Sequence, residues 1–104
     1  MKTYILDGKT PVLEPDIVKW AQWYESADRV VRSSTFEVKV DGALVQTVEV
    51  LTVFWGVLLF KRDSFQRLFE TRFLKDGSCS TVDWASSWEH AEAIHENALS
   101  SLMG

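Results

Sequence analysis

Three Asp-Gly dipeptides limit the fold of this 104-residue chain more than any other feature of its sequence. They occupy positions 7–8, 41–42 and 76–77. Each follows a segment with the pattern of a β-strand, and residues 36–40 show that pattern most clearly, because apolar and charged side chains alternate there. Glycine adopts a positive φ without strain, so Asp-Gly favours the tight turn of a hairpin. The dipeptides therefore predict antiparallel strands joined by short loops.

Two further segments show the period of a helix. The first is expected to begin at residues 14–16, where a proline lies between two carboxylates. Its apolar stripe is Ile17, Trp20, Ala21, Tyr24 and Ala27. The second is expected to begin at Ser86, which has the spacing of a capping box with Glu89. An apolar arc then continues from Trp88 to Leu102, so both helices are predicted to pack against the sheet.

The predicted order of elements is β-α-β-β-β-β-α. Strands are expected at 3–6, 36–40, 45–54, 68–75 and 80–84. Beyond residue 50 the alternation gives way to an apolar run, 50–60, which is typical of a strand covered on both faces. No linker or internal repeat divides the chain, so residues 1–104 are predicted to form a single α+β domain. Its architecture is one antiparallel sheet of about four to five strands with two helices.

Charge and residue usage exclude several classes of function. The 11 basic and 15 acidic side chains give a formal net charge of −4, which argues against direct nucleic-acid binding. One cysteine cannot close an internal disulfide, and two histidines are a poor set of metal ligands, so neither metal nor cofactor is expected. The first residues lack the apolar region of a signal peptide, and the run 50–60 is shorter than the roughly 20 residues of a spanning helix. We therefore expect a cytoplasmic protein with no membrane partner.

Catalysis is not expected either. Cys79, His95 and Asp83 include the residue types of a nucleophile, a base and an orienting carboxylate, but nothing in the sequence brings them together. His95 also lies within the apolar arc of the second helix, where a histidine is more often part of the core. His90 and His95 stand at i and i+5, which separates them around the helix axis and makes them a poor metal-binding pair.

Aromatic residues are numerous, with five tryptophans, six phenylalanines and two tyrosines. Most fall on helix stripes or strand positions that such a domain buries. Trp23 flanks its helix stripe and Trp55 has the opposite strand parity to Phe54, so these two rings are candidates for contact with a partner. The glycines form no phosphate-binding motif, but stacking on aromatic rings leaves open a pocket for a nucleotide-like ligand.

The C-terminal part of the chain is acidic. Residues 83–104 contain four acidic side chains and no lysine or arginine, and three of the acidic ones share a flank of the second helix: Glu89, Glu92 and Glu96. The simplest interpretation is a solvated helix face. The alternative is an acidic surface that docks on the basic groove of a nucleic-acid-binding complex and competes with phosphate. With Trp23 and Trp55, these glutamates are the predicted partner-binding residues.

The apolar run 50–60 also has a second interpretation. If it lies at an edge of the sheet, its open backbone groups favour pairing with a second copy of the chain. The sequence therefore leaves open a homodimer with a continuous sheet.

Six segments of the chain together form a recognisable pattern. They are Tyr4–Val12, Trp20–Glu25, Asp28–Val31, Thr52–Gly56, Leu68–Thr71, and Trp88–Glu92 followed by His95. In this order they resemble a family of small uncharacterised proteins encoded by phages and prophages, and the similarity covers nearly the whole chain. One segment departs from the family pattern. After the equivalent of Gly56, family members usually have an aspartate–histidine pair and a glycine-rich loop, whereas residues 57–63 here are apolar and then charged.

The resemblance implies a phage origin. Small phage proteins of this kind often act on host machinery, including the inhibition of host defence. The resemblance therefore implies a non-enzymatic accessory protein that binds and inhibits a host protein or complex, such as an anti-phage defence complex, in the cytoplasm of the host cell. The alternative is a phage protein that sequesters a small nucleotide-like ligand.

Overall fold

A computed structural model of the chain describes residues 2–58 and 66–103. Within these ranges it has two helices and two antiparallel sheets, which confirms the predicted α+β class. The elements are β1 (Lys2–Asp7), β2 (Thr10–Leu13), α1 (Ile17–Ser26), β3 (Val30–Val40), β4 (Ala43–Phe54), β5 (Val57–Leu58), β6 (Phe69–Lys75), β7 (Ser78–Ala85) and α2 (Trp88–Met103). The end of the apolar run 50–60 and most of the departing segment 57–63 lie outside the described residues.

The larger sheet is a meander in the order β3-β4-β6-β7, with each strand antiparallel to its neighbours. β4 is central in it, as the first interpretation of the apolar run predicts. β4 therefore does not offer the free edge that the second interpretation, pairing with another copy, requires. The smaller sheet has the order β2-β1-β5. The prediction of a single sheet was therefore wrong, because the apolar run is interrupted between β4 and β5.

A sharp turn at Gly56 separates the two sheets. Gly56 has a φ of 72°, and a Cβ atom there would lie 2.9 Å from the carbonyl oxygen of Tyr4. The Tyr4 amide donates a hydrogen bond to the Gly56 carbonyl oxygen at 2.7 Å, and Thr3 is aligned with Val57 of β5. Glycine tolerates this φ and this close approach without strain, so the chain can leave β4 here and join β1.

The second and third Asp-Gly dipeptides form the hairpin turns that the sequence predicts. Both residues of each pair have a positive φ, 52° and 81° at 41–42 and 50° and 78° at 76–77, as in type I′ turns. At the first dipeptide the turn residues are instead Gly8 and Lys9, and the following strand β2 was not predicted. Pro11 argues against a central strand, but β2 is an edge strand, where proline is tolerated.

Helix α1 is held mainly by aromatic side chains. Asp16 caps it, because its carboxylate accepts hydrogen bonds from two amides of the first turn. Trp20 and Tyr24 of the predicted stripe are half-buried, whereas Ile17 is exposed and no residue of α1 is fully buried. The indole N–H of Trp20 donates to the Tyr4 carbonyl oxygen at 3.1 Å and ties the helix to β1.

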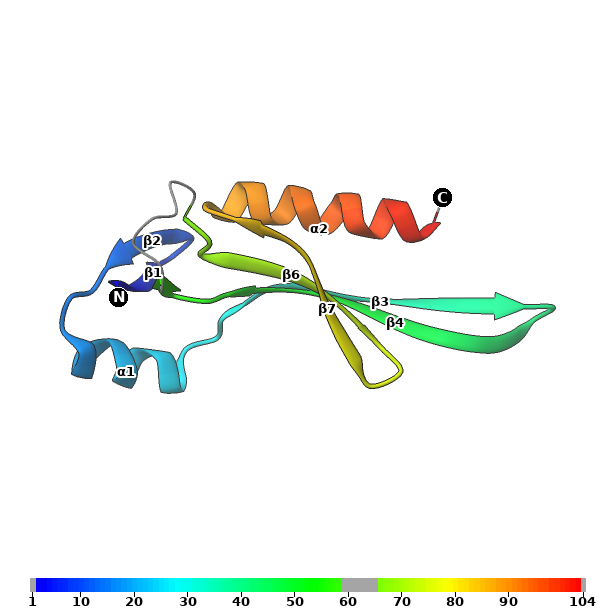
Figure 1. The fold of residues 1–104 in the computed structure, drawn as a ribbon, viewed down its shortest axis with the longest axis horizontal. Helices are drawn as coiled ribbons and strands as arrows, with labels where there is room; N and C mark the ends of the chain where they lie inside the picture. The colour runs from blue at the N-terminus through cyan, green and yellow to red at the C-terminus, as the bar shows by residue number, and fades with distance from the viewer. Residues whose placement is uncertain (1, 59–65, 104) are drawn as a thin grey trace.

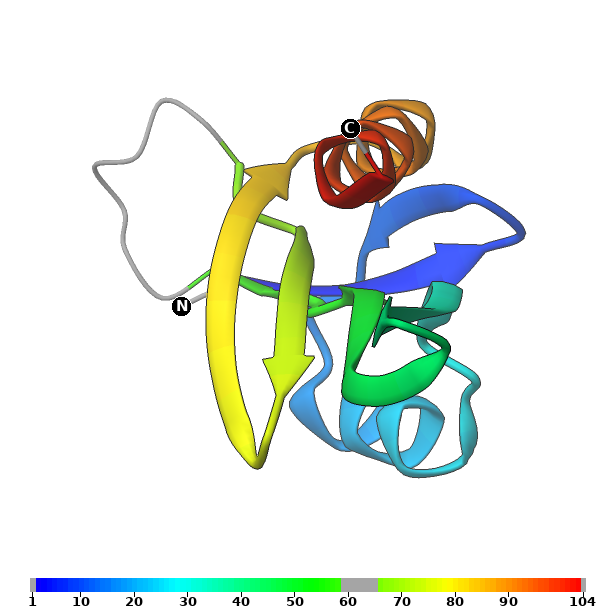
Figure 2. The same cartoon turned by 90° about the vertical axis from the view of Figure 1, so that its right-hand side faces the viewer.

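Helix α2 covers one face of the larger sheet, in contact with β3, β4, β6 and β7, while α1 lies on the opposite side of the molecule (Figures 1 and 2). Its cap is Ser87 and not Ser86, since the Ser87 hydroxyl accepts a hydrogen bond from the His90 amide at 3.2 Å. The prediction of a capping box with Glu89 was therefore wrong, because the cap lies one residue later and His90 occupies the position that the box requires to be Glu or Gln.

The core lies at one end of the larger sheet, where its buried members are Phe54, Leu68, Phe69, Ala85, Ala91 and Ile94. From this packed end the β3–β4 hairpin projects beyond the C-terminus of α2 (Figure 1). We call residues 36–48 of this hairpin the arm. The molecule measures 54 × 28 × 23 Å and has a radius of gyration of 15.7 Å, against about 13 Å for a compact chain of this length.

Candidate binding sites

The predicted acidic flank lies along α2, and part of its charge is engaged within the molecule. Glu89 is exposed in the first turn. Glu96 forms an ion pair with Arg32 of β3, and Glu92 accepts a hydrogen bond from the indole N–H of Trp88. Because α2 contains no lysine or arginine, its outer side is acidic, but two of the three glutamates also support the fold.

The two predicted partner-binding tryptophans are half-buried and lie apart from the glutamates. Trp23 of α1 packs edge-to-face on Phe54, with ring centroids 5.9 Å apart. Trp55, which follows β4, packs edge-to-face on Trp84 with centroids 5.3 Å apart. Since α1 and α2 lie on opposite sides of the molecule (Figure 2), Trp23 does not extend the acidic surface.

A polar cluster surrounds Glu70, a residue only 5% exposed, on the face of the larger sheet that points away from α2. The indole N–H of Trp55 and the hydroxyl of Thr81 donate to its carboxylate at 3.1 and 2.6 Å, and Arg72 forms an ion pair with it. Burial alone would raise the pKa of Glu70, but these hydrogen bonds, led by that of Thr81, hold the pKa below its ordinary value. The cluster fixes the orientation of Trp55.

On the other face of the sheet, His95 is fully buried and links α2 to three strands. Its Nε2 is 2.9 Å from the Ser34 hydroxyl of β3, and its Nδ1 is 2.9 Å from the Thr52 hydroxyl of β4. The Thr52 hydroxyl also bonds the Thr71 hydroxyl of β6 at 2.7 Å. Burial, and secondly the charge of Arg32, lower the pKa of His95. The expected core histidine is confirmed, with both of its ring nitrogens hydrogen-bonded.

Cys79 and Asp83 do not join His95. Both are exposed on β7, and Cys79 alternates with Ser80, which faces α2, so the thiol points to the opposite face of the sheet. A serine beside a histidine, as at Ser34, is a pairing that nucleophilic enzymes use. Here Thr52 and not a carboxylate bonds the second nitrogen, and the ring is closed to solvent.

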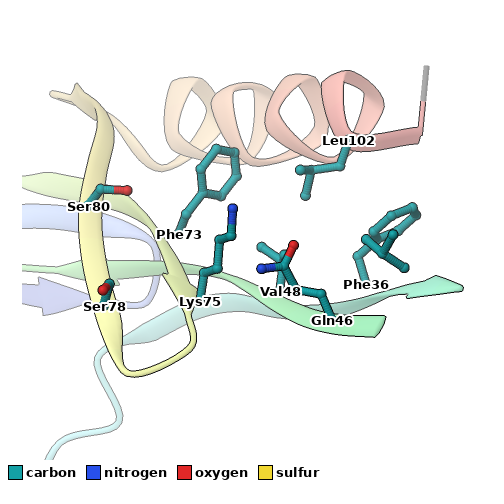
Figure 3. A pocket seen from close by; sticks show the side chains of 9 residues that line it. Phe36, Gln46, Val48, Phe73, Lys75, Ser78, Ser80 and Leu102 are labelled. Carbon is teal, nitrogen blue, oxygen red and sulfur yellow. The ribbon is translucent and has the colours of Figure 1, made fainter. Parts of the chain in front are cut away.

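Beyond His95, towards the arm, the space between α2 and the larger sheet opens into a cavity of about 380 Å³, which we call the α2 hollow (Figure 3). Its lining residues are Phe36, Val38, Gln46, Val48, Phe73, Lys75, Ser78, Ser80 and Leu102. Lys75 points from β6 towards the α2 side of the hollow (Figure 3). The hollow offers the aromatic rings of Phe36 and Phe73 and the positive charge of Lys75, and its volume is within the range of small-molecule sites. This combination suits a flat anionic ligand.

A second apolar surface lies where β2 meets α1. Leu13, Ile17 and Val18 are 49%, 48% and 60% exposed. A shallow hollow of about 470 Å³ is bordered by Lys2, Thr3, Leu13, Pro15 and Ile17. Two hydrogen bonds hold this connection, from the Thr3 hydroxyl to the Glu14 carbonyl oxygen at 2.5 Å and from the Glu14 amide to the Thr3 carbonyl oxygen at 2.8 Å. We call Leu13, Pro15, Ile17 and Val18 the β2–α1 patch.

The structure was also searched for a metal site and a membrane-spanning helix, and the chain was compared with known proteins. In the part of the chain that the structure describes, no three His, Cys, Asp or Glu side chains are grouped so as to hold a metal ion. Neither α1 nor α2, over its described residues, is long and apolar enough to cross a membrane. A scan against protein-family models found no match, and neither did searches of curated proteins and of solved structures.

Sequence reasoning missed the β2–α1 patch and the α2 hollow. Val18 carries a signal for the patch, since it lies off the apolar stripe of its helix, but β2 itself was not predicted. The hollow has no local signal, because its lining comes from five separate elements.

Proposed function

We propose that the chain is a non-enzymatic accessory protein of phage origin that binds and blocks a host protein or protein complex, such as an anti-phage defence complex. The observation that carries the binding role is the β2–α1 patch. Leu13 and Ile17 border one shallow hollow, and large aliphatic side chains exposed beside each other are typical of protein–protein contact sites. The phage origin rests on the resemblance of the six sequence segments to phage and prophage proteins.

The structure of the patch supports a contact site that is formed before binding. Its backbone is tied to β1 by the two hydrogen bonds between Thr3 and Glu14, and Asp16 caps the helix that carries Ile17 and Val18. A surface already held in place loses less conformational entropy on binding than a mobile one.

The acidic side of α2 supports a second, electrostatic contact with a basic host surface. It lies on the other side of the molecule from α1, the helix that carries Ile17 and Val18 of the patch (Figure 2). Charge complementarity mainly raises the rate of association and is weakened by salt, whereas contact at the apolar patch persists at high salt. Salt dependence therefore distinguishes the two contacts.

Affinity capture from host lysate tests this proposal. We expect the wild-type chain to retain a host protein at high salt, and the variant Leu13→Glu/Val18→Glu to retain at least about tenfold less. The matched control is Val82→Glu, at a residue 38% exposed on β7, which should capture as the wild type does. The proposal fails if the wild type retains no host protein, or if the patch variant and the control retain equal amounts.

Charge reversal at Glu89 tests the acidic contact separately. Glu89 is exposed, so Glu89→Lys leaves untouched the ion pair of Glu96 and the hydrogen bond of Glu92. We expect slower association with the captured partner at low salt and little difference at high salt. An unchanged association rate at low salt would remove α2 from the interface.

The α2 hollow favours a second candidate function, in which the chain sequesters a nucleotide-like ligand. Phe36 and Phe73 supply rings for stacking, and Lys75 supplies a positive charge for phosphate. A nucleotide panel should then raise the melting temperature of the wild type but not of Lys75→Ala, with Lys19→Ala on α1 as the control. No shift for any nucleotide, and no nucleotide in mass spectra of the purified chain, would exclude this function.

A further inference from the structure

The outer edge of β3 has no strand beside it among the strands that the structure describes. Along the arm, this edge carries apolar side chains on one face, and Val40 is 55% exposed. A long edge with alternating apolar residues favours pairing with another strand. We infer that the outer half of β3 pairs antiparallel with the same segment of a second copy of this chain. The result is a homodimer with one continuous sheet, a property separate from the proposed host-binding role.

The side chains of the arm are complementary to themselves in one register. When two copies pair antiparallel about a two-fold axis at Val38, each Phe36 lies opposite Val40 of the other copy. On the opposite face, each Glu37 lies opposite Lys39 of the other copy. Glu37 and Lys39 already share one face within a copy, 3.7 Å apart, and both are more than half exposed. The register therefore joins two apolar pairs and two ion pairs around a central valine pair.

Moving the axis by one residue destroys this complementarity. An axis at Glu37 places two glutamates opposite each other, and Lys39 then faces Thr35. An axis at Lys39 places two lysines opposite each other, and Glu37 then faces Asp41. Like charges directly opposite each other destabilise a strand pair. Charge therefore favours the register centred on Val38 over both neighbouring registers.

The shape of the molecule agrees with this pairing. The tip of the arm projects beyond α2, and the radius of gyration is about 3 Å larger than expected for a compact chain, so the end of β3 is accessible to another copy (Figure 1). In the dimer both α2 helices lie on the same face of the joined sheet, because the two-fold axis is perpendicular to it. Phe36 and Val38 line the α2 hollow, so the second copy also covers the side of the hollow nearest the arm.

Charge reversal at Glu37 and Lys39, which are both exposed, tests the register of the two strands without disturbing the core. Sedimentation equilibrium of the wild type should give a mass that rises from monomer to dimer with concentration. Glu37→Lys and Lys39→Glu should each weaken self-association at least about tenfold, because each places four like charges at the axis. An equimolar mixture of the two variants should dimerise again, as should the double variant, and Lys19→Glu should behave as the wild type. A monomeric wild type, undiminished dimers of the single variants or a mixture that stays monomeric would each overturn the inference.

A disulfide across the axis tests the position of the axis directly. In a Cys79→Ser background, which removes the exposed native thiol, Val38→Cys should form a covalent dimer under mild oxidation. Thr35→Cys should not, because its two copies lie roughly 20 Å apart in this register. Crosslinking of Thr35→Cys, or none of Val38→Cys, would contradict the proposed axis.

Discussion

The strands β3 and β4 run from the packed end into the arm, and the two regions differ in what covers these strands. In β4, Val50 and Phe54 are inaccessible to solvent, whereas Leu44 and Val45 are more than half exposed. The difference is α2, which covers the larger sheet and ends before the tip of the hairpin (Figure 1). The packed end therefore supplies the stability of the fold, and the exposed side chains near the tip of the arm, such as Val40, Leu44 and Val45, are available for contact with another molecule.

The largest expected effect separates the two regions directly. Phe54→Ala should lower the free energy of unfolding by about 4 kcal/mol, because it leaves a cavity in the core. Leu44→Ala, in the same strand, should lower it by less than about 0.5 kcal/mol. Chemical denaturation at low protein concentration measures both values. A cost at Leu44 close to that at Phe54 would show that the arm is part of the core.

The next effect concerns the histidine that attaches α2 to the sheet. His95→Ala should cost about 3 kcal/mol, because the hydroxyls of Ser34 and Thr52 lose their bonds to its ring. The folded pKa of His95 is below its ordinary value, so the unfolded chain binds the proton more tightly. Stability should therefore be complete above about pH 6.5 and decrease as the pH falls below that value. Denaturation at several pH values should show this slope in the wild type and in the exposed-site control His90→Gln, but not in His95→Asn.

A smaller effect tests the junction of the two sheets. Gly56→Ala should cost about 2 kcal/mol, because a Cβ atom at this positive φ also meets the Tyr4 carbonyl oxygen. Gly77→Ala is the matched control, since Gly77 has a similar φ of 78° but open space around its Cα, and it should cost about 1 kcal/mol. Equal costs measured by thermal denaturation would mean that the contact between β1 and the turn is loose.

The smallest of these effects concerns Glu70, the buried carboxylate that accepts a hydrogen bond from the Trp55 indole. Glu70→Gln should cost about 1.5 kcal/mol at pH 7, because charge-assisted hydrogen bonds become neutral ones. The folded pKa of Glu70 is lowered, so its contribution is present above the unfolded value of about 4.3 and is lost as the pH falls through the folded pKa. Acid denaturation should therefore shift in Glu70→Gln relative to the exposed-site control Glu25→Gln. Coincident acid curves would show that the cluster does not stabilise the fold.

Local patterns were sufficient to predict most of the larger sheet. Alternation over residues 36–40 and the dipeptides at 41–42 and 76–77 define its hairpins, because strand period and turn conformation are properties of neighbouring residues. The smaller sheet was not predictable in the same way. The strand β2 contains a proline, and β5 has two residues, so neither carries a strand pattern of its own. Their pairing depends on the turn at Gly56, whose role is visible only in three dimensions.

The candidate sites, like the two sheets, were predictable only where they depend on local sequence patterns. The acidic flank of α2 followed from helical spacing, but its partners Arg32 and Trp88 depend on packing between elements and on rotamers. Trp23 was chosen because it flanks the apolar stripe of its helix, and Trp55 because it has the opposite strand parity to Phe54. These rules place a ring on one face of an element, but they do not show which side chains cover that face. For Trp55, the covering ring is Trp84, which is distant in the sequence.

The smaller sheet also has a consequence for the order in which the chain folds. Thr3 is aligned with Val57, whereas the β3–β4 and β6–β7 hairpins join residues that are near neighbours along the chain. Closing a long segment costs more conformational entropy than closing a hairpin, and folds rich in distant contacts form more slowly. The two hairpins should thus assemble early, and β1 should dock last, after β5 has been synthesised. On unfolding, the same strand should open before the centre of the larger sheet, so hydrogen exchange should be faster in β1 than in β6.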